Sequence, residues 1–250
     1  MSDAAPALTL DSVTVRFGGV LAVDDVSMTV RAGERRAVIG PNGAGKTTLV
    51  RAVSGEVLPN AGKVELFGRD ITRRAPNRRA HLGIGRTYQV TNLFPNLSVS
   101  DNVAVAAHGH SRKRFASWRP VRLRGDIGER VDQALEQVGL ADRRHRTVGE
   151  LSHGEQRQLE LAMGLAGRPR VLLLDEPAAG LSASERVLMR DLILGLPDDL
   201  SLILIEHDMD LALRLVEWVT VLDNGRQIAD GPPDEIRENE TVQAVYLRSE

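Results

Sequence analysis

A glycine-rich segment that ends in lysine and threonine carries the strongest chemical signal in this chain. It spans residues 40–48, and its letters GPNGAGKTT fit the pattern G-x-x-x-x-G-K-[ST]. A loop with little side-chain bulk lets successive backbone N–H groups turn toward an anion, and the start of a helix adds its positive dipole. The lysine can neutralise phosphate charge, and the threonine hydroxyl can bind Mg²⁺. The segment is therefore predicted to bind a nucleoside triphosphate through Gly40, Pro41, Asn42, Gly43, Ala44, Gly45, Lys46, Thr47 and Thr48, with Thr47 as a metal ligand.

The residues on either side of this loop support the same interpretation. Arg36–Ile39 reads as a short apolar strand that runs into the loop, and Lys46–Ser54 reads as a helix that stops at Gly55. A strand before the loop and a helix after it are the context that the pattern needs. The alternative is a glycine-rich turn that only caps a helix.

Two adjacent acids follow an apolar run further along the chain. Residues 171–174 read Val-Leu-Leu-Leu and lead into Asp175 and Glu176. A buried strand that ends here places both acids at the carboxyl edge of a parallel sheet, where ligands of open α/β sheets bind. We expect Asp175 to hold Mg²⁺ and Glu176 to orient and polarise the attacking water as a general base. The alternative is a strand end whose acids face solvent.

Three single residues near these motifs could complete a nucleotide site. Gln89 lies where strand content gives way to helices, and its amide could reach Mg²⁺ or the attacking water. His207 follows the apolar run 202–205 and could donate a hydrogen bond to the γ-phosphate, while Phe17 could stack on the adenine ring. The alternatives are a surface glutamine, a capping or surface histidine and a core phenylalanine. Position alone does not decide among these roles.

The overall composition limits the class of protein. The 250 residues are 42% hydrophobic and 26% charged, as in an ordinary globular protein. A net charge of -2 argues against a protein that binds nucleic acid through bulk electrostatics. The absence of cysteine excludes disulfides and thiolate metal sites. The sequence has neither the start of a signal peptide nor an apolar run near the roughly 20 residues of a membrane helix, so any membrane role is expected to act through a partner.

The order of the expected elements indicates an α/β fold with an inserted helical part. Strands predominate up to residue 67, helices predominate from about 90 to 167, and strands and helices alternate after residue 170. That alternation argues for a parallel sheet with crossover helices. Besides those already given, the expected elements are strands at Leu8–Phe17, Val26–Val30, Lys63–Phe67, Ser201–Ile205, Val219–Leu222 and Arg226–Ala229, and helices at Ser100–Ala107, Gly128–Gln137, Gln156–Ala166, Ser184–Leu194, Asp208–Val216 and after Pro233.

Taken together, the motifs resemble the nucleotide-binding subunits of ABC transporters, over essentially the whole chain. Strings at residues 85–87, 175–181 and 205–209, and the ending at 235–247, look most like the branched-chain amino acid type. The order of the motifs carries the resemblance: the Walker A loop at 40–48, the Q-loop at Gln89, the signature at Leu151–Glu155, Walker B at Val171–Glu176, the D-loop at Gly180–Ser182 and the switch histidine His207.

The resemblance implies one cassette with a P-loop NTPase core, a mainly parallel sheet, an antiparallel N-terminal β part and a helical lobe. The core is expected at residues 1–89 and 168–250, the lobe at 90–167 and a tail helix at 233–250. It also implies an ATPase that uses ATP and Mg²⁺, with Glu176, His207 and Gln89 as catalytic residues, Thr47, Gln89 and Asp175 at the metal, and Phe17 at the nucleotide.

The signature also has a reading from its own residues. Ser152 and Glu155 fit a capping box at the start of a helix, and a helix start with an outward serine and glycine is an anion site. The resemblance implies that Ser152, Gly154 and Glu155 face the γ-phosphate bound to an opposite subunit, in a head-to-tail dimer that encloses two ATP molecules. His153 departs from the commoner glycine, and we expect its side chain to be exposed.

The resemblance further implies partners in a membrane complex. These are a second ATPase subunit, identical or related, transmembrane permease subunits that dock near residues 89–97, and indirectly a substrate-binding protein, with no nucleic acid. The chain is then expected at the cytoplasmic face of the cell membrane, held there by the permease. The cargo would be branched-chain or other hydrophobic amino acids, with urea, other amides or lipid-linked cargo as alternatives; import and export are both compatible with the residues.

Two other classes of function are compatible with a P-loop. An ABC ATPase of DNA repair or of the ribosome commonly carries two cassettes or a long coiled coil, whereas this chain has one P-loop and no sustained heptad pattern. A nucleotide-gated interaction module that does not hydrolyse ATP has no need of a base at Glu176. The basic stretch at 111–124 has two readings: contact with anionic lipid or an acidic partner, or a solvated insertion, which we favour.

Overall fold

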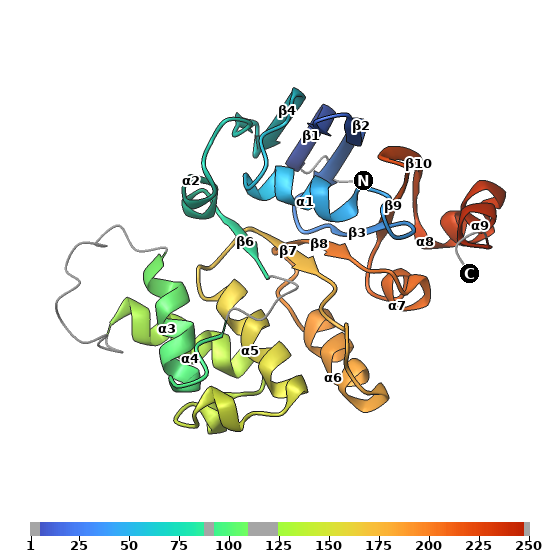
Figure 1. Ribbon diagram of the computed structural model, residues 1–250. Coiled ribbons are helices and arrows are strands. Elements are labelled where there is room, and N and C mark those ends of the chain that lie inside the picture. The colour runs from blue at the N-terminus through green and yellow to red at the C-terminus, as the bar shows by residue number, and fades with distance from the viewer. Residues whose placement is uncertain (1–5, 88–92, 110–124, 248–250) are drawn as a thin grey trace.

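The computed structural model describes residues 6–87, 93–109 and 125–247. Figure 1 shows an antiparallel sheet at the top, a mainly parallel sheet across the middle and a group of helices below. This is the α/β fold with a P-loop core, an antiparallel N-terminal part and a helical lobe that the sequence predicts.

The antiparallel sheet consists of four strands in the order β2-β1-β4-β5. β1 (Pro6–Phe17) and β2 (Val20–Arg31) pair over most of their length, and β4 (Ala61–Leu66) joins the other side of β1. The short β5 (Arg69–Asp70) is not predicted, because two exposed residues after a turn carry no periodicity. One face of this sheet packs against α1, the helix at Lys46–Ser54.

The second sheet has six strands in the order β10-β9-β3-β8-β7-β6, and neighbours are parallel except for β10. Ile205 lies opposite both Val38 and Asp175, so three strands end at one edge. The strands are β3 (Arg35–Ile39), β6 (Ile84–Arg86), β7 (Val171–Asp175), β8 (Ser201–Ile205), β9 (Trp218–Asp223) and β10 (Arg226–Gly231).

α1 (Lys46–Ser54) packs between the two sheets. Its Leu49 and Val50 are buried in one cluster with Val15 of β1 and Leu173 of β7. The helix starts after Gly45 and ends at Gly55, and both glycines are left-handed. The predicted bounds of this helix are therefore confirmed, because glycines that carry positive φ terminate helices at either end.

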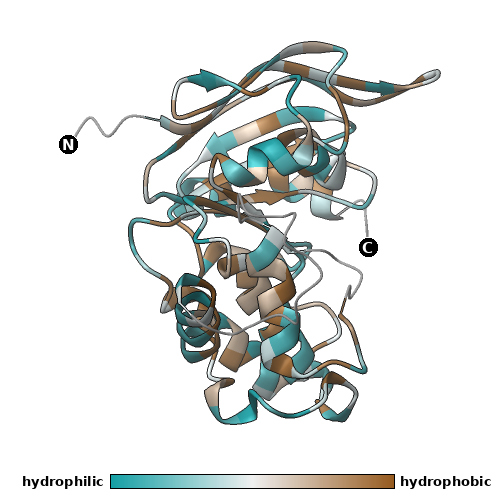
Figure 2. Cartoon of the chain, turned by 90° about the vertical axis from the view of Figure 1, so that its left-hand side faces the viewer, coloured by the Kyte–Doolittle hydropathy of each residue, from teal (hydrophilic) through white to brown (hydrophobic). Residues whose placement is uncertain are grey.

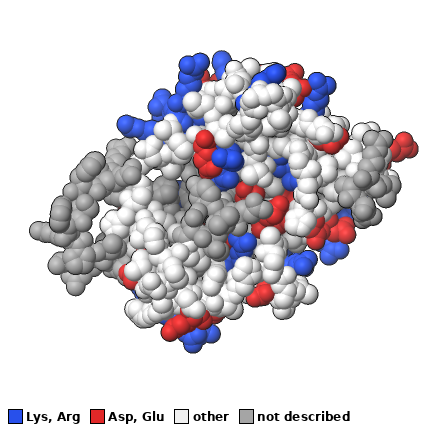
Figure 3. All heavy atoms as spheres, in the orientation of Figure 1, with Lys and Arg blue, Asp and Glu red and all other residues white. Residues whose placement is uncertain are grey.

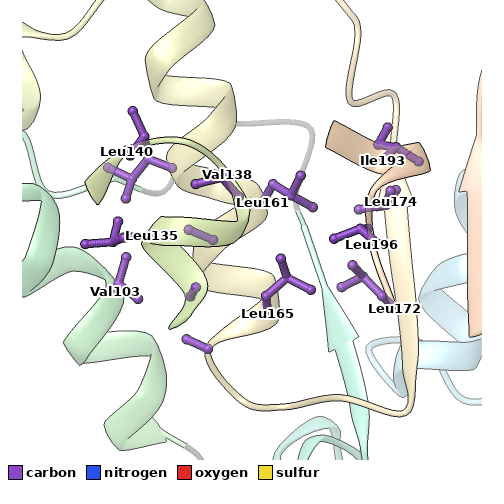
Figure 4. Close-up of a cluster of buried hydrophobic side chains, with 14 of the residues drawn as sticks. Val103, Leu135, Val138, Leu140, Leu161, Leu165, Leu172, Leu174, Ile193 and Leu196 are labelled. Atoms are coloured by element: carbon purple, nitrogen blue, oxygen red, sulfur yellow. The ribbon is translucent and has the colours of Figure 1, made fainter. Parts of the chain in front are cut away.

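The helical lobe contains α3 (Val99–Gly109), α4 (Asp126–Gln137) and α5 (His153–Leu165), with short 3₁₀ turns at Ala141–Arg143 and Val148–Glu150. Its helices are polar on some sides and apolar on others (Figure 2). Side chains such as Val103, Leu135 and Leu161 form a cluster that reaches Leu172 of β7 (Figure 4). The described part of this lobe has no strand, as predicted, and contains the isolated bridge Ser98–Thr147.

The remaining helices connect the strands of the core. α6 (Ala183–Leu194) follows β7, and α7 (Met209–Leu213) is shorter than the predicted 208–216. α2 (Pro76–His81) is not predicted, because its six residues are mostly polar and its start carries no side-chain cap. No helix in the described ranges is long and apolar enough to cross a membrane.

The C-terminal end differs from the single tail helix predicted for residues 233–250. It forms α8 (Pro233–Glu238) and α9 (Glu240–Leu247), separated at the extended residue Asn239. The Asn239 carboxamide oxygen accepts hydrogen bonds from the backbone N–H groups of Thr241 and Val242. An asparagine that bonds the following amides competes with helix continuation, so it ends one helix and caps the next.

Candidate functional site

The phosphate loop joins β3 to α1 and is held against neighbouring backbone. Gly40 and Gly45 have φ angles of +145° and +101°, which L side chains rarely adopt. A Cβ atom at Gly40 would collide with the carbonyl oxygen of Leu222, and one at Gly45 with that of Ala22. These two glycines are therefore required by space as well as by backbone conformation, and they keep the loop open toward a ligand.

Lys46 lies inside this loop. Its buried side chain donates hydrogen bonds from Nζ to the carbonyl oxygens of Gly40 at 2.6 Å and Pro41 at 2.9 Å. Burial lowers the pKa of the Lys46 amine, and the charges of Glu176 and Asp175 act in the opposite direction. The charge of the amine is therefore favoured by both acids, and its hydrogen-bond partners are neutral carbonyls that an anion can replace.

Asp175 ends β7 and is almost fully buried. Arg86 donates a hydrogen bond from Nη2 to Asp175 Oδ2 at 3.3 Å, and Asp175 Oδ1 has no hydrogen-bond partner in the described chain. Burial raises the pKa of Asp175, and Arg86 lowers it in part. A buried carboxylate oxygen without a donor has the chemistry of a ligand for a hard cation such as Mg²⁺. The donor set therefore fits the metal, with the exposed hydroxyl residue Thr47 at the start of α1.

Glu176 and His207 lie together at the edge where β7 and β8 end. Glu176 has a φ of +49°, and its backbone N–H donates to the carbonyl oxygen of Ile205 at 3.0 Å. His207 Nδ1 lies 3.8 Å from Glu176 Oε1, and the histidine side chain is 58% exposed. The positive φ turns the chain directly after the strand, which sets Glu176 apart from the buried Asp175 and leaves it within reach of a ligand.

Glu206 is a buried acid at this edge that sequence reasoning does not single out. Its side chain is 1% exposed, and Ala178 donates its backbone N–H to Glu206 Oε1 at 3.4 Å. Burial is the main cause that raises the pKa of Glu206 to about 7, and nearby Glu176 and Asp208 add to it. An acid directly after the apolar run 202–205 is a signal that could have found it.

Figure 3 shows acidic and basic side chains close together along the boundary between core and lobe.

The signature residues form the start of α5, as the capping-box pattern predicts. Ser152 caps the helix by accepting from the N–H of Glu155 at 3.2 Å, and Glu155 Oε2 accepts from the N–H of Ser152 at 2.9 Å. Arg143 donates to the other Glu155 oxygen at 3.3 Å, and these bonds lower the pKa of Glu155. The carboxylate of Glu155 therefore serves the cap, while Ser152 is exposed and Gly154 is buried beside Glu185.

Of the other residues predicted for the site, Phe17 is described by the structure and Gln89 is not. Phe17 ends β1 and is 48% exposed, so it is a surface aromatic rather than a core residue. Gln89 lies outside the described residues, and so does the basic stretch 111–124.

Arg79 and Arg86 are further buried side chains that sequence reasoning does not identify. Arg86 forms ion pairs with both Glu56, at 2.6 Å from Nη1 to Oε1, and Asp175. Arg79 donates hydrogen bonds to carbonyl oxygens near the end of α1. Basic residues in a run such as 73–79 are usually solvated, so no pattern distinguishes the one that is buried.

Sequence comparisons place the chain among known proteins. The profile described as ABC transporter matches residues 23–179, and the one described as branched-chain amino acid ATP-binding cassette transporter matches residues 226–247. The chain is 37% identical over 249 residues to BraF, a high-affinity branched-chain amino acid transport ATP-binding protein of Pseudomonas aeruginosa, covering 97% of this chain and 98% of BraF. It is 34% identical to LivG of Escherichia coli, described in the same terms, with the same coverage.

The fold gives the same result. A solved ATP-binding cassette of an ABC transporter, in its ADP conformation, superposes with a TM-score of 0.87 at 27% identity, over 97% of this chain and 98% of that one. A nucleotide-free cassette superposes with a TM-score of 0.86. Since sequence, fold and the order of the site residues agree over nearly the whole length, the chain belongs to the family of ABC transporter ATP-binding proteins.

Proposed function

We propose that the chain hydrolyses ATP with Mg²⁺ to energise a membrane transporter for branched-chain or other hydrophobic amino acids. One observation carries the enzymatic part: the strand that leads into the loop with Lys46 and the strand that leads into Asp175 and Glu176 end at the same edge of the parallel sheet. The cargo class is supported by the named relatives BraF and LivG and by the C-terminal match at residues 226–247.

Each site residue has a proposed role in this reaction. The backbone N–H groups of the loop at 40–48, which Pro41 lacks, and the amine of Lys46 hold the phosphates, and Phe17 stacks on the base. Thr47, Asp175 and Gln89 would hold Mg²⁺, which would supply positive charge to neutralise the phosphates. Glu176 orients the attacking water and accepts its proton, and His207 donates a hydrogen bond to the γ-phosphate.

The start of α5 supplies the second half of the site in this proposal. An exposed hydroxyl at Ser152 and the N–H of Gly154 lie at the positive end of the helix dipole, which favours an anion. The γ-phosphate bound to a facing subunit would bridge the two chains, identical or related, and its hydrolysis would remove the bridge. ATP binding and hydrolysis thus close and open a dimer.

The permease is proposed to dock in a groove of about 250 Å³ between core and lobe. Its walls include Ile84, Leu93 and Met163. Phe94 and Leu97, which follow Leu93 in the chain, are exposed apolar side chains. Exposed apolar surface beside a cleft is typical of a protein interface. We therefore place the chain at the cytoplasmic face of the membrane through this contact, with a substrate-binding protein acting indirectly. Phe94→Ala and Leu97→Ala are expected to weaken co-purification of the permease.

ATP turnover of purified variants tests the enzymatic part. Lys46→Ala is expected to abolish Mg²⁺-dependent ATP binding by calorimetry, since the buried amine is lost from the loop. Glu176→Gln should bind ATP, lose turnover by at least about a hundredfold and accumulate a long-lived dimer. Near-normal turnover of Glu176→Gln would contradict the assignment of the base. Uptake of labelled leucine and of labelled urea by the assembled complex then distinguishes the cargo classes.

A further inference from the structure

The first turns of α5 and α6 meet through a single carboxylate. Glu185, in the first turn of α6, accepts a hydrogen bond at Oε1 from the backbone N–H of Gly154 at 3.1 Å. Gly154 is the second residue of α5, so the bond runs from the signature helix to the helix that follows Walker B. The contact therefore ties the helical lobe to an element directly connected to the hydrolytic strand.

The position of Glu185 is set by several contacts. Its Oε2 accepts from the N–H of Ser182 at 2.9 Å and from the Ser182 hydroxyl at 2.7 Å, which closes the capping box of α6. These bonds are the main cause that lowers the pKa of Glu185, with smaller contributions from Gly154 and His153. A Cβ atom at position 154 would collide with Glu185 Oε1, so the glycine admits this carboxylate. The same side chain thus caps α6 and faces the positive end of α5.

The N–H of Gly154 is one of the donors that α5 offers to an anion. A carboxylate oxygen and a phosphate oxygen cannot both take this donor at hydrogen-bond distance, and their like charges repel. Any phosphate that reaches Gly154 must therefore first displace Glu185.

We propose that Glu185 is an intramolecular latch that occupies the anion-binding end of α5 until the γ-phosphate on a facing subunit displaces it. This inference rests on the proposed ATP-dependent dimer. The latch stabilises the separated subunit in competition with the enclosed nucleotide, so the binding-competent fraction is reduced and more ATP is needed to form the dimer. Each dimer contains two such contacts.

The test measures the ATP concentration at half-maximal dimer formation by sedimentation, in a Glu176→Gln parent that cannot turn over the nucleotide. Adding Glu185→Gln keeps the capping box, because glutamine as well as glutamate at the third residue of a helix can accept the cap hydrogen bond. The substitution removes the negative charge that lies beside the N–H of Gly154. The half-maximal concentration is expected to fall by roughly three- to tenfold, because a partly buried charged contact is lost in both subunits of the dimer. Glu185→Ala should lower it at least as far.

Asp191→Asn is the matched control, since it removes one exposed acid from the same helix at a residue that bonds to Arg190. It should leave the half-maximal concentration unchanged, and melting temperatures verify that each variant folds. A parent that forms no dimer with ATP overturns the proposed enclosure and the latch with it. A parent that dimerises while Glu185→Gln leaves the midpoint equal or higher, or while Asp191→Asn shifts it equally, overturns the latch alone.

Discussion

Arg79 is a fully buried cation that bonds backbone carbonyls. Its Nη1 donates to the carbonyl oxygens of Ala52 at 2.6 Å and Val53 at 2.7 Å, near the end of α1, and its other nitrogens reach Thr72 at 2.8 Å and Arg74 at 2.9 Å. The last carbonyls of a helix have no partner within the helix, so the guanidinium satisfies them. We predict that Arg79→Met strongly destabilises the protein, although Arg79 forms no ion pair with the residues that the structure describes.

The magnitude follows from two opposing contributions. Four charge-assisted hydrogen bonds are worth at least about 1.5 kcal/mol each, and their loss leaves buried carbonyls unsatisfied. Against this, burial lowers the pKa of Arg79 to about 10, which corresponds to a cost of about 3 kcal/mol for holding the charge inside. The bonds outweigh the cost, so Arg79→Met should reduce the free energy of unfolding by about 3–5 kcal/mol.

Urea unfolding of the wild type and the variants provides the measurement. The comparison requires that the slope of the unfolding free energy against urea concentration is the same in each protein. Arg78→Met is the matched control, because the neighbouring arginine is exposed and should cost less than about 0.5 kcal/mol. Arg79→Lys should recover less than half of the loss, since an ammonium lacks the planar fork that reaches four carbonyls. If Arg79→Met costs no more than Arg78→Met, the guanidinium does not hold the end of α1 and the reasoning is refuted.

Two further predictions concern the edge of the parallel sheet. Folding raises the pKa of the Glu206 carboxyl. The protonated side chain therefore contributes fully to the free energy of unfolding at a pH below its unfolded pKa, and this contribution is lost as the pH rises through about 7. Glu206→Gln should therefore gain about 3 kcal/mol relative to wild type between pH 4.5 and 8, measured by urea unfolding; a constant difference would contradict this. Gly45→Ala should weaken ATP binding by calorimetry at least about tenfold more than Gly43→Ala. Both glycines have positive φ, but a Cβ at Gly45 meets the Ala22 carbonyl and one at Gly43 meets nothing within 4 Å; equal losses would show that crowding is irrelevant.

Elements with a strong local signal are the ones that the sequence predicts well. The run Ser201–Ile205 has the same bounds in the structure, and α1 ends at the glycine expected to stop it. In both cases the signal is local, either an apolar run of strand length or a glycine at a helix end. The short elements α2 and β5 are missed because six and two residues, mostly polar, have no periodicity to read.

Buried polar residues of the site are harder to predict than its motifs. The loop and the acids at 175 and 176 follow from pattern and context. The place of Glu206 after an apolar run is a weaker signal, and nothing in the sequence indicates that Arg79 is buried while Arg78 is exposed. The burial of Glu206 and Arg79 depends on partners far along the chain, such as the carbonyl oxygens of Ala52 and Val53 for Arg79. The contact of Glu185 with Gly154 is likewise long-range, since either residue alone reads as part of a local helix start.

The groove proposed as the docking site shares side chains with the candidate nucleotide site, which would connect docking to the chemistry. Arg86 lines the groove, donates to the Ser54 hydroxyl at 2.9 Å at the end of α1, and bonds Asp175 at the sheet edge. Arg79 lines the same groove and holds the carbonyls of the preceding turn. A partner that shifted these two arginines would therefore act on Asp175, the proposed metal ligand, and on α1, whose other end is the phosphate loop.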